Sequence, residues 1–86
     1  MRAVVAVIGK DAVGILARVA TKCAEYNANV VEVSQSVLED IFAMTMLVDI
    51  SRLNKEFTLL VDDLSAMGKS MGLEIHTRSE ERRVGK

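Results

Sequence analysis

The stretch from residue 29 to residue 50, NVVEVSQSVLEDIFAMTMLVDI, decides the fold. Residues 30–38 and 41–50 each alternate along the chain, and only Glu39 and Asp40 separate the two runs. Alternation with a period of two is typical of a strand, and a two-residue connection predicts a tight antiparallel hairpin. In the second run the larger apolar side chains share one face, which is therefore expected to lie on the core: Phe42, Met44, Met46, Val48 and Ile50.

The first run predicts a second apolar face, on which one polar residue interrupts the valines. Alternation places Val31, Val33, Gln35 and Val37 together, and Val30, Glu32, Ser34 and Ser36 on the opposite side. A carboxamide on an apolar face needs a hydrogen-bond partner. Gln35 is therefore a candidate contact for a ligand or for a neighbouring subunit.

Helical periodicity flanks the hairpin on both sides. Apolar residues recur every three or four positions in residues 15–28 and again in residues 55–71, which predicts two amphipathic helices. Asn27 and Gly72 suit the left-handed backbone at a helix end, and Ser51 or Asn54 is expected to cap the second helix. Residues 2–8 form a short run rich in valine and residues 73–77 alternate, so both are expected to be strands.

The resulting order is βαββαβ, which predicts an α+β fold. Right-handed crossovers and one hairpin give a four-stranded antiparallel sheet in the order 4-1-3-2, with both helices on one face. This arrangement is the ferredoxin-like sandwich. A single domain is expected over residues 1–79, and the charged residues 80–86, EERRVGK, are expected to form a disordered tail.

The composition of the 86 residues argues against several classes of function. Eleven Lys and Arg against twelve Asp and Glu, with few aromatics, do not favour nucleic-acid binding. No apolar run is long enough for a membrane span, and the first residues do not resemble a signal peptide. One Cys and one His provide no disulfide, metal set or catalytic constellation. We therefore expect a cytoplasmic protein that is no enzyme and has no cofactor.

One face of the sheet is expected to lack a cover. The central strands, residues 2–8 and 41–50, carry apolar side chains on both faces, whereas the helices cover only one. Ala43, Thr45 and Leu47 are expected on the open side. A second copy of the chain is the simplest cover, so the sequence predicts a homodimer.

Three segments together resemble a known family. Residues 7–15, VIGKDAVGI, resemble the first strand and loop of an ACT domain. Asn29, fifteen residues beyond Gly14, resembles the Asn that opens the second strand of that family. Residues 34–44, SQSVLEDIFAM, are similar to the free-standing single-ACT proteins of an uncharacterised family, which are related to the ACT halves of the glycine cleavage repressor. The resemblance extends over residues 2–78.

The resemblance implies a regulatory module that binds an amino acid or a similar small carboxylate metabolite at a dimer interface. Such ligands lie between the first loop of one subunit and the second strand of its neighbour. The helix that follows this loop offers free N–H groups to a carboxylate. The sequence departs from some amino-acid-binding members at Ala12 and Val13, where they carry polar residues. The ligand-binding residues implied here are Lys10, Asp11, Gly14, Asn29, Val30 and Gln35.

The candidate ligand-binding residues could instead have purely structural roles, and the protein could have a different function. Asp11 could serve only as a helix cap, Asn29 only as a helix end, and Lys10 only as a solvated charge. Cys23 is expected to be a buried thiol and His76 a surface residue. The alternative function is a protein-interaction subunit without a ligand of its own, which docks on a regulated enzyme or a regulator protein.

Overall fold

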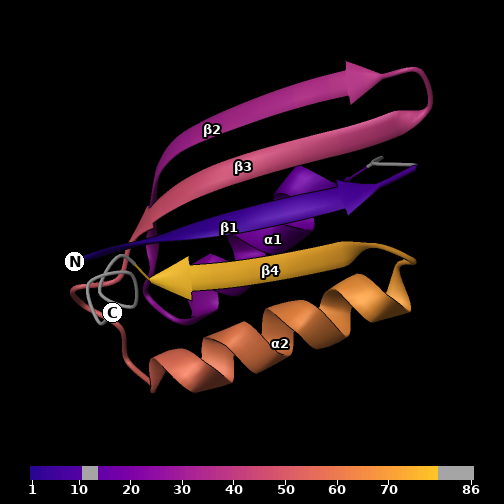
Figure 1. Ribbon diagram of the computed structural model, residues 1–86. Helices are drawn as coiled ribbons and strands as arrows, with labels where there is room; N and C mark the ends of the chain where they lie inside the picture. The colour runs from indigo at the N-terminus through magenta and orange to yellow at the C-terminus, as the bar shows by residue number, and fades with distance from the viewer. Residues whose placement is uncertain (11–13, 80–86) are drawn as a thin grey trace, which may run out of the picture.

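The computed structural model describes residues 1–10 and 14–79 (Figure 1). The predicted βαββαβ order is confirmed, and the sheet runs β2-β3-β1-β4, which is the predicted strand order. Neighbouring strands are antiparallel throughout. The elements are β1 (Arg2–Gly9), α1 (Ile15–Glu25), β2 (Asn29–Leu38), β3 (Ile41–Asp49), α2 (Phe57–Ser70) and β4 (Glu74–Ser79).

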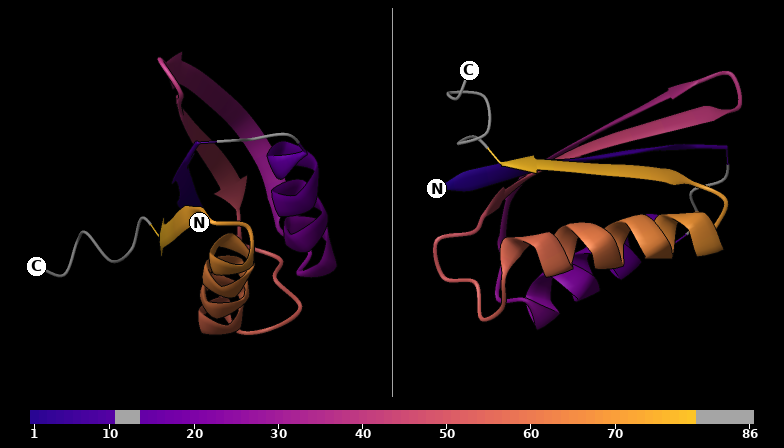
Figure 2. Two further views of the ribbon diagram at one scale, coloured as in Figure 1. Left: turned by 90° about the vertical axis from the view of Figure 1, so that its right-hand side faces the viewer. Right: turned by 60° about the horizontal axis from the view of Figure 1, so that its bottom comes forward.

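Both helices lie on one face of the sheet, as predicted (Figure 2). The core between them is built from the alternating inward residues of β1 and β3 and from the apolar stripes of α1 and α2. Each fully buried aliphatic side chain contributes about 1.5–3 kcal/mol to stability. The largest of these buried side chains are Ile15, Met44, Met46, Leu60 and Leu64.

The alternation predicted for β2 is wrong at its start, because the strand contains an irregularity there. Val30 pairs with Val48 and Glu32 pairs with Leu47, so Val31 is an extra residue between two consecutive positions of β3. Because of this bulge, the residues of β2 before Val31 lie on the face of the sheet opposite to the one that simple alternation predicts for them. Val30 therefore packs against the core, while Val31 is 50% exposed.

The connections around the two helices confirm some predicted roles and correct others. Asn27 and Gly72 both have a positive φ, 61° and 75°, and end the two helices as expected. The first helix ends at Glu25, earlier than residue 28. The second begins after Glu56, which makes no side-chain cap, so neither Ser51 nor Asn54 caps it. These two side chains form other hydrogen bonds in the preceding loop.

The opposite face of the sheet has no helix over it. Leu47 lies there between Val4 of β1 and Glu32 of β2, and Ile8 lies further along β1. Val4 and Ile8 are 38% and 46% exposed. The predicted orientation of β3, with Met44 and Met46 toward the helices, is thus confirmed.

Two further expectations concern features beyond this sheet. The predicted tail, residues 80–86, lies outside the described residues. Among residues 1–10 and 14–79, no helix is long and apolar enough to cross a membrane.

Candidate functional site

The residues predicted at the first loop lie at the end of β1. Lys10 is exposed immediately after this strand, and Asp11 lies outside the described residues. Gly14 is exposed and takes up a left-handed conformation, with φ 76° and ψ 3°, at the N-cap position of α1. Apart from Gly14 itself and its chain neighbours, no heavy atom of the described residues lies within 4 Å of a Cβ built at position 14.

The N-terminus of α1 is suited to a negatively charged group. The carbonyl of Gly14 accepts a hydrogen bond from the N–H of Arg18 at 3.1 Å, which starts the helix. The first N–H groups of any helix lack an intrahelical acceptor and carry a partial positive charge. Among the described residues no side chain caps this end, and the first turn holds no acidic residue.

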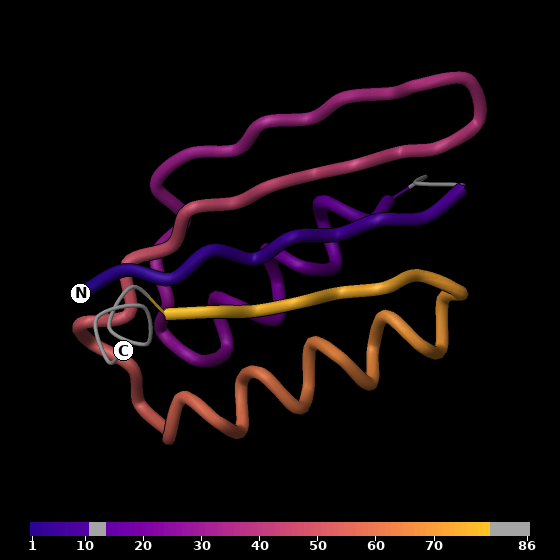
Figure 3. Tube along the Cα trace, in the orientation of Figure 1, coloured from indigo at the N-terminus to yellow at the C-terminus, as the bar shows by residue number. Residues whose placement is uncertain are grey.

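Asn29 lies at the other end of the sheet. It begins β2 and is level with Asp49 of β3, which is itself level with Arg2 at the start of β1. Gly14 follows the end of β1, so the length of a strand, about 25 Å, separates the two positions within one chain. Figure 3 shows the start of β2 near the N-terminus and the end of β1 at the opposite end.

The remaining two predicted residues have different environments. Val30 is half-buried and packs against the core, so its side chain faces away from solvent. Gln35 is exposed midway along β2, level with Met44. Its carboxamide makes no hydrogen bond to the described residues. Because β2 is an edge strand, Gln35 is accessible to a second molecule.

A polar hollow of about 450 Å³ surrounds the Asn29 end of the sheet. The sequence predicted Asn29 as a ligand contact but none of its neighbours, which come from the α1–β2 connection, the end of β3 and the loop after it; Asn27 and Ser51 were expected only at helix ends. Asp49 Oδ1 accepts hydrogen bonds from the Ser51 N–H at 2.9 Å and from the Ser51 hydroxyl at 2.6 Å. The lining residues are Asn27, Asn29, Asp49, Ser51 and Arg52.

Three hydrogen bonds tie this loop to the end of α1. Asn27 Nδ2 donates to the Arg52 carbonyl at 2.8 Å. Asn54 donates twice, from its backbone N–H to the Tyr26 carbonyl at 3.2 Å and from Nδ2 to the Glu25 carbonyl at 3.1 Å. The backbone on both sides of the hollow is therefore held in place.

Tyr26, at the end of α1, links the loop after β3 to α2. Its ring is buried, its hydroxyl donates to Asp63 Oδ2, and Lys55 Nζ lies 4.9 Å from the ring centroid. The hydrogen bond to Asp63, followed by burial, raises the pKa of Tyr26 to about 12. The phenol thus stays protonated at neutral pH and acts as a hydrogen-bond donor.

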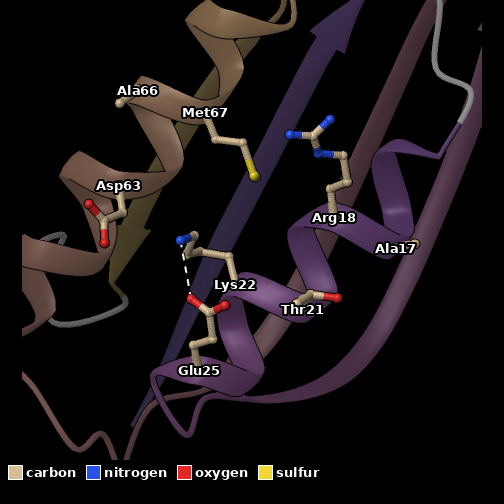
Figure 4. Close-up of a pocket in the computed structure, with 8 residues that line it drawn as sticks. All are labelled: Ala17, Arg18, Thr21, Lys22, Glu25, Asp63, Ala66 and Met67. Carbon is tan, nitrogen blue, oxygen red and sulfur yellow. Dashed lines mark hydrogen bonds and ion pairs between the residues drawn. The ribbon is translucent and has the colours of Figure 1, made fainter.

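A second hollow, a shallow groove of about 560 Å³, separates α1 from α2 (Figure 4). Lys22 Nζ pairs with Glu25 Oε1 at 3.1 Å, and Figure 4 shows Asp63 on α2, across the groove from this pair. Arg18 and Met67 line the other end of the groove. None of the predicted ligand-binding residues lies here.

The two side chains considered for chemistry have the predicted structural roles. Cys23 is fully buried on the inner face of α1, and burial raises the pKa of its thiol. His76 is exposed on the edge strand β4, with Nε2 3.3 Å from Glu74 Oε1. Within residues 1–10 and 14–79, no cluster of His, Cys, Asp and Glu could hold a metal ion.

Comparison with known proteins places this geometry in a family. The sequence model of the ACT domain family matches residues 2–78 of this chain. The chain belongs to the ACT domain family. ACT domains are generally regulatory, ligand-binding modules rather than catalytic ones. The match extends over nearly all of the described strands and helices.

Individual relatives agree with this assignment. A UPF0237 protein from Listeria innocua is 47% identical over 81 residues, which cover 94% of this chain and 91% of that protein. The solved structure of an ACT domain protein from Streptococcus pneumoniae has 35% identity and a TM-score of 0.80, and covers 92% of this chain and 89% of its own.

A more distant structure shares the fold alone. The solved structure of a "putative glycine cleavage system transcriptional repressor" has 20% identity and a TM-score of 0.73. The match covers 90% of this ACT domain and 44% of the repressor chain. The relatives from Listeria innocua and Streptococcus pneumoniae confirm the predicted resemblance to small ACT domain proteins, and the repressor shares the fold.

Proposed function

We propose that this ACT domain is a regulatory module, not an enzyme, which binds an amino acid or a similar small carboxylate metabolite between two copies of the chain. One observation carries the proposal. The two exposed landmarks, Gly14 and Asn29, lie at opposite ends of one sheet, so one chain cannot bring them to the same ligand. A two-fold axis that sets the strands of two copies antiparallel brings each Asn29 to the Gly14 end of its partner.

The two ends offer complementary groups to such a ligand. The N-terminus of α1 offers N–H groups to a carboxylate, and the left-handed Gly14 leaves the backbone there accessible. The carboxamide of Asn29 both donates and accepts hydrogen bonds. Lys10 and Gln35 are exposed and available as further contacts, and Val30 supports Asn29 from the core side. Asp11 completes the proposed set.

The proposal includes three general properties of the protein. The domain extends over residues 1–79, and residues 80–86 form a charged tail. The protein is cytoplasmic, which a buried, unpaired thiol at Cys23 suits. The ligand signal passes to a regulated enzyme or a regulator protein. The alternative function, a protein-interaction module without a ligand, is favoured by the apolar open face of the sheet around Leu47.

Ligand binding is tested by thermal shift against the twenty amino acids, followed by calorimetry. A ligand at a hundred times its dissociation constant adds about 2.7 kcal/mol to stability. We expect Asn29→Ala to weaken binding by roughly 1–3 kcal/mol, the cost of an unpaired polar group. Gly14→Val should abolish binding, and Gly14→Asn is the cleaner variant because Asn tolerates a positive φ.

Two outcomes would contradict the proposal. If no amino acid binds the wild-type protein at millimolar concentration, the protein-interaction function replaces it. If an amino acid binds but neither Asn29→Ala nor Gly14→Asn changes its affinity, the ligand site lies elsewhere in the molecule.

A further inference from the structure

The hollow beside Asn29 contains charges of both signs. Asp49 supplies a carboxylate, and Arg52 supplies a guanidinium from the loop that follows β3. The two hydrogen bonds from Ser51 both end on Asp49 Oδ1, so Oδ2 is not needed to hold this turn. In the strand register Asp49 also faces Arg2 on one side and Asn29 on the other.

Asp49 is held in its charged form. The hydrogen bonds from the Ser51 hydroxyl and backbone N–H, and then the positive charges of the N-terminus and Arg52, hold the pKa of Asp49 below its ordinary value. Partial burial opposes this shift without reversing it. At neutral pH the hollow therefore offers a carboxylate that only accepts hydrogen bonds, beside a guanidinium that only donates them.

The framework of this hollow exists before any ligand arrives. The Arg52 carbonyl is held by Asn27, and the loop is held again by Asn54 against the end of α1. A binding site whose backbone is already ordered loses less entropy when a ligand binds. The volume of about 450 Å³ is large enough for a small metabolite.

We propose that this hollow recognises both charges of a free α-amino acid: Asp49 receives the ammonium group and Arg52 receives the carboxylate, beside the Asn29 carboxamide. The inference rests on the proposed function and adds two residues to its site. Because a planar guanidinium binds a carboxylate with two parallel hydrogen bonds, Arg52 fixes its orientation. The partner's α1 N-terminus then closes over the same carboxylate.

The pair should reject molecules that carry only one of the two charges. A site that pairs with a charged group of its ligand binds an analogue without that group much more weakly, because the charged side chain of the site is left unpaired. An N-acetylated amino acid leaves Asp49 without its ammonium partner. An amino acid amide leaves Arg52 without its carboxylate. Selectivity for the free zwitterion follows.

The experiment compares two charge-removing variants by calorimetry. The probes are the twenty L-amino acids, followed by the N-acetyl and amide derivatives of the one that binds most tightly. Asp49→Asn keeps an oxygen for Ser51 and removes the charge, and Arg52→Gln leaves the Arg52 carbonyl for Asn27. Asp62→Asn and Lys69→Gln, exposed on α2, are the matched controls.

We expect each hollow variant to weaken binding of the free amino acid by roughly tenfold or more, and the controls to bind like the wild type. Asp49→Asn should also lose the preference for the free amine over its N-acetyl form. Arg52→Gln should lose the preference for the acid over its amide. Melting temperatures measured without ligand check that all four variants are folded.

Failure of this inference differs from failure of the proposed function. If Asn29→Ala weakens binding but Asp49→Asn and Arg52→Gln bind both the acid and its derivatives like the wild type, the charge recognition is overturned and the proposed function stands. If the wild-type protein binds none of the twenty amino acids, both are overturned.

Discussion

Tyr26 is the residue at which α1, α2 and the loop after β3 meet. Its hydroxyl bonds Asp63 of α2, its carbonyl accepts from Asn54, and its ring lies beneath Lys55. These contacts hold the loop that follows Asp49 and carries Arg52. The stability of the candidate site thus depends on a residue that does not line it.

The titration of Tyr26 is directly measurable, because the chain has one Tyr and no Trp. We expect the phenolate absorbance of the folded protein to rise with a midpoint near pH 12, since Asp63 and burial raise the pKa of Tyr26 to about 12. Asp63→Asn should lower this midpoint. Asp62→Asn, one position away, should lower it much less, because its charge acts without a hydrogen bond.

The same shift predicts a pH-dependent contribution to stability. The pKa of Tyr26 is higher in the folded state than in the unfolded state. The contribution of its hydroxyl to the free energy of unfolding is therefore fully present below the unfolded pKa, near 10, and is lost as the pH rises toward 12. The free energies of unfolding of the wild type and Tyr26→Phe in urea should therefore differ at pH 8 and converge as the pH rises from 10 toward 12. A constant difference across this range would contradict the role assigned to Asp63.

Individual site residues were partly predictable from the sequence. Gly14 and Asn29 were found through their family pattern, and Asn27 through its tolerance of a left-handed backbone. Asp49 and Arg52 were missed, because their meeting with Asn29 depends on the register of three strands. Alternation shows which face a residue takes, but not which residue lies beside it on the next strand.

At the scale of elements, α2 and β4 form the most extensive contact between a helix and a strand. Gly68 faces β4, and a Cβ at this position would lie 2.8 Å from Ile75 Cγ1 and 3.1 Å from the Leu73 carbonyl oxygen. Leu73 and Ile75 are both buried, so neither can move far. The helix can approach the strand this closely only because residue 68 has no side chain.

Gly68→Ala should therefore destabilise the protein by about 1–3 kcal/mol through overpacking, although alanine favours a helix. Chemical unfolding followed by circular dichroism measures this loss. Lys69→Ala, on the exposed side of the same turn, serves as the control and should be nearly neutral. Equal or greater stability of Gly68→Ala would mean that α2 packs less closely than described.

The elements themselves were predictable, whereas their irregularities were not. Periodicity identified both helices and the strands β2, β3 and β4, and a run rich in valine identified β1. The bulge at Val31 left no signal, since Val30 and Val31 are chemically identical and either fits the core. Ser51 and Asn54 are common cap residues, but in this structure they bond to Asp49 and to the end of α1.

For the whole molecule, the central question is how a second copy binds. The open face of the sheet combines Val4, Ile8 and Leu47 beside polar edge strands, and β2 is itself an unpaired edge of ten residues. Apolar faces and free strand edges are both surfaces through which chains associate. We expect a homodimer with about twice the monomer mass in sedimentation at micromolar concentration.

Leu47→Glu should dissociate this dimer and leave the helix content largely unchanged, because Leu47 points away from the helices. Leu47→Lys should do the same without placing a second carboxylate opposite Glu32. Leu59→Glu is the matched control, since Leu59 is 48% exposed on the outer side of α2. Dimers that persist in both Leu47 variants would exclude the open face as the contact.

The most direct test of a shared site uses two defective chains together. Asn29→Ala and Gly14→Asn chains are co-expressed, and amino acid binding is measured by calorimetry. If the site combines Gly14 of one copy with Asn29 of the other, each variant alone binds weakly. The mixture then regains wild-type affinity at roughly a quarter of the wild-type number of sites, because each mixed dimer has one intact site. A mixture that binds no better than the separate variants would contradict a site shared between two chains.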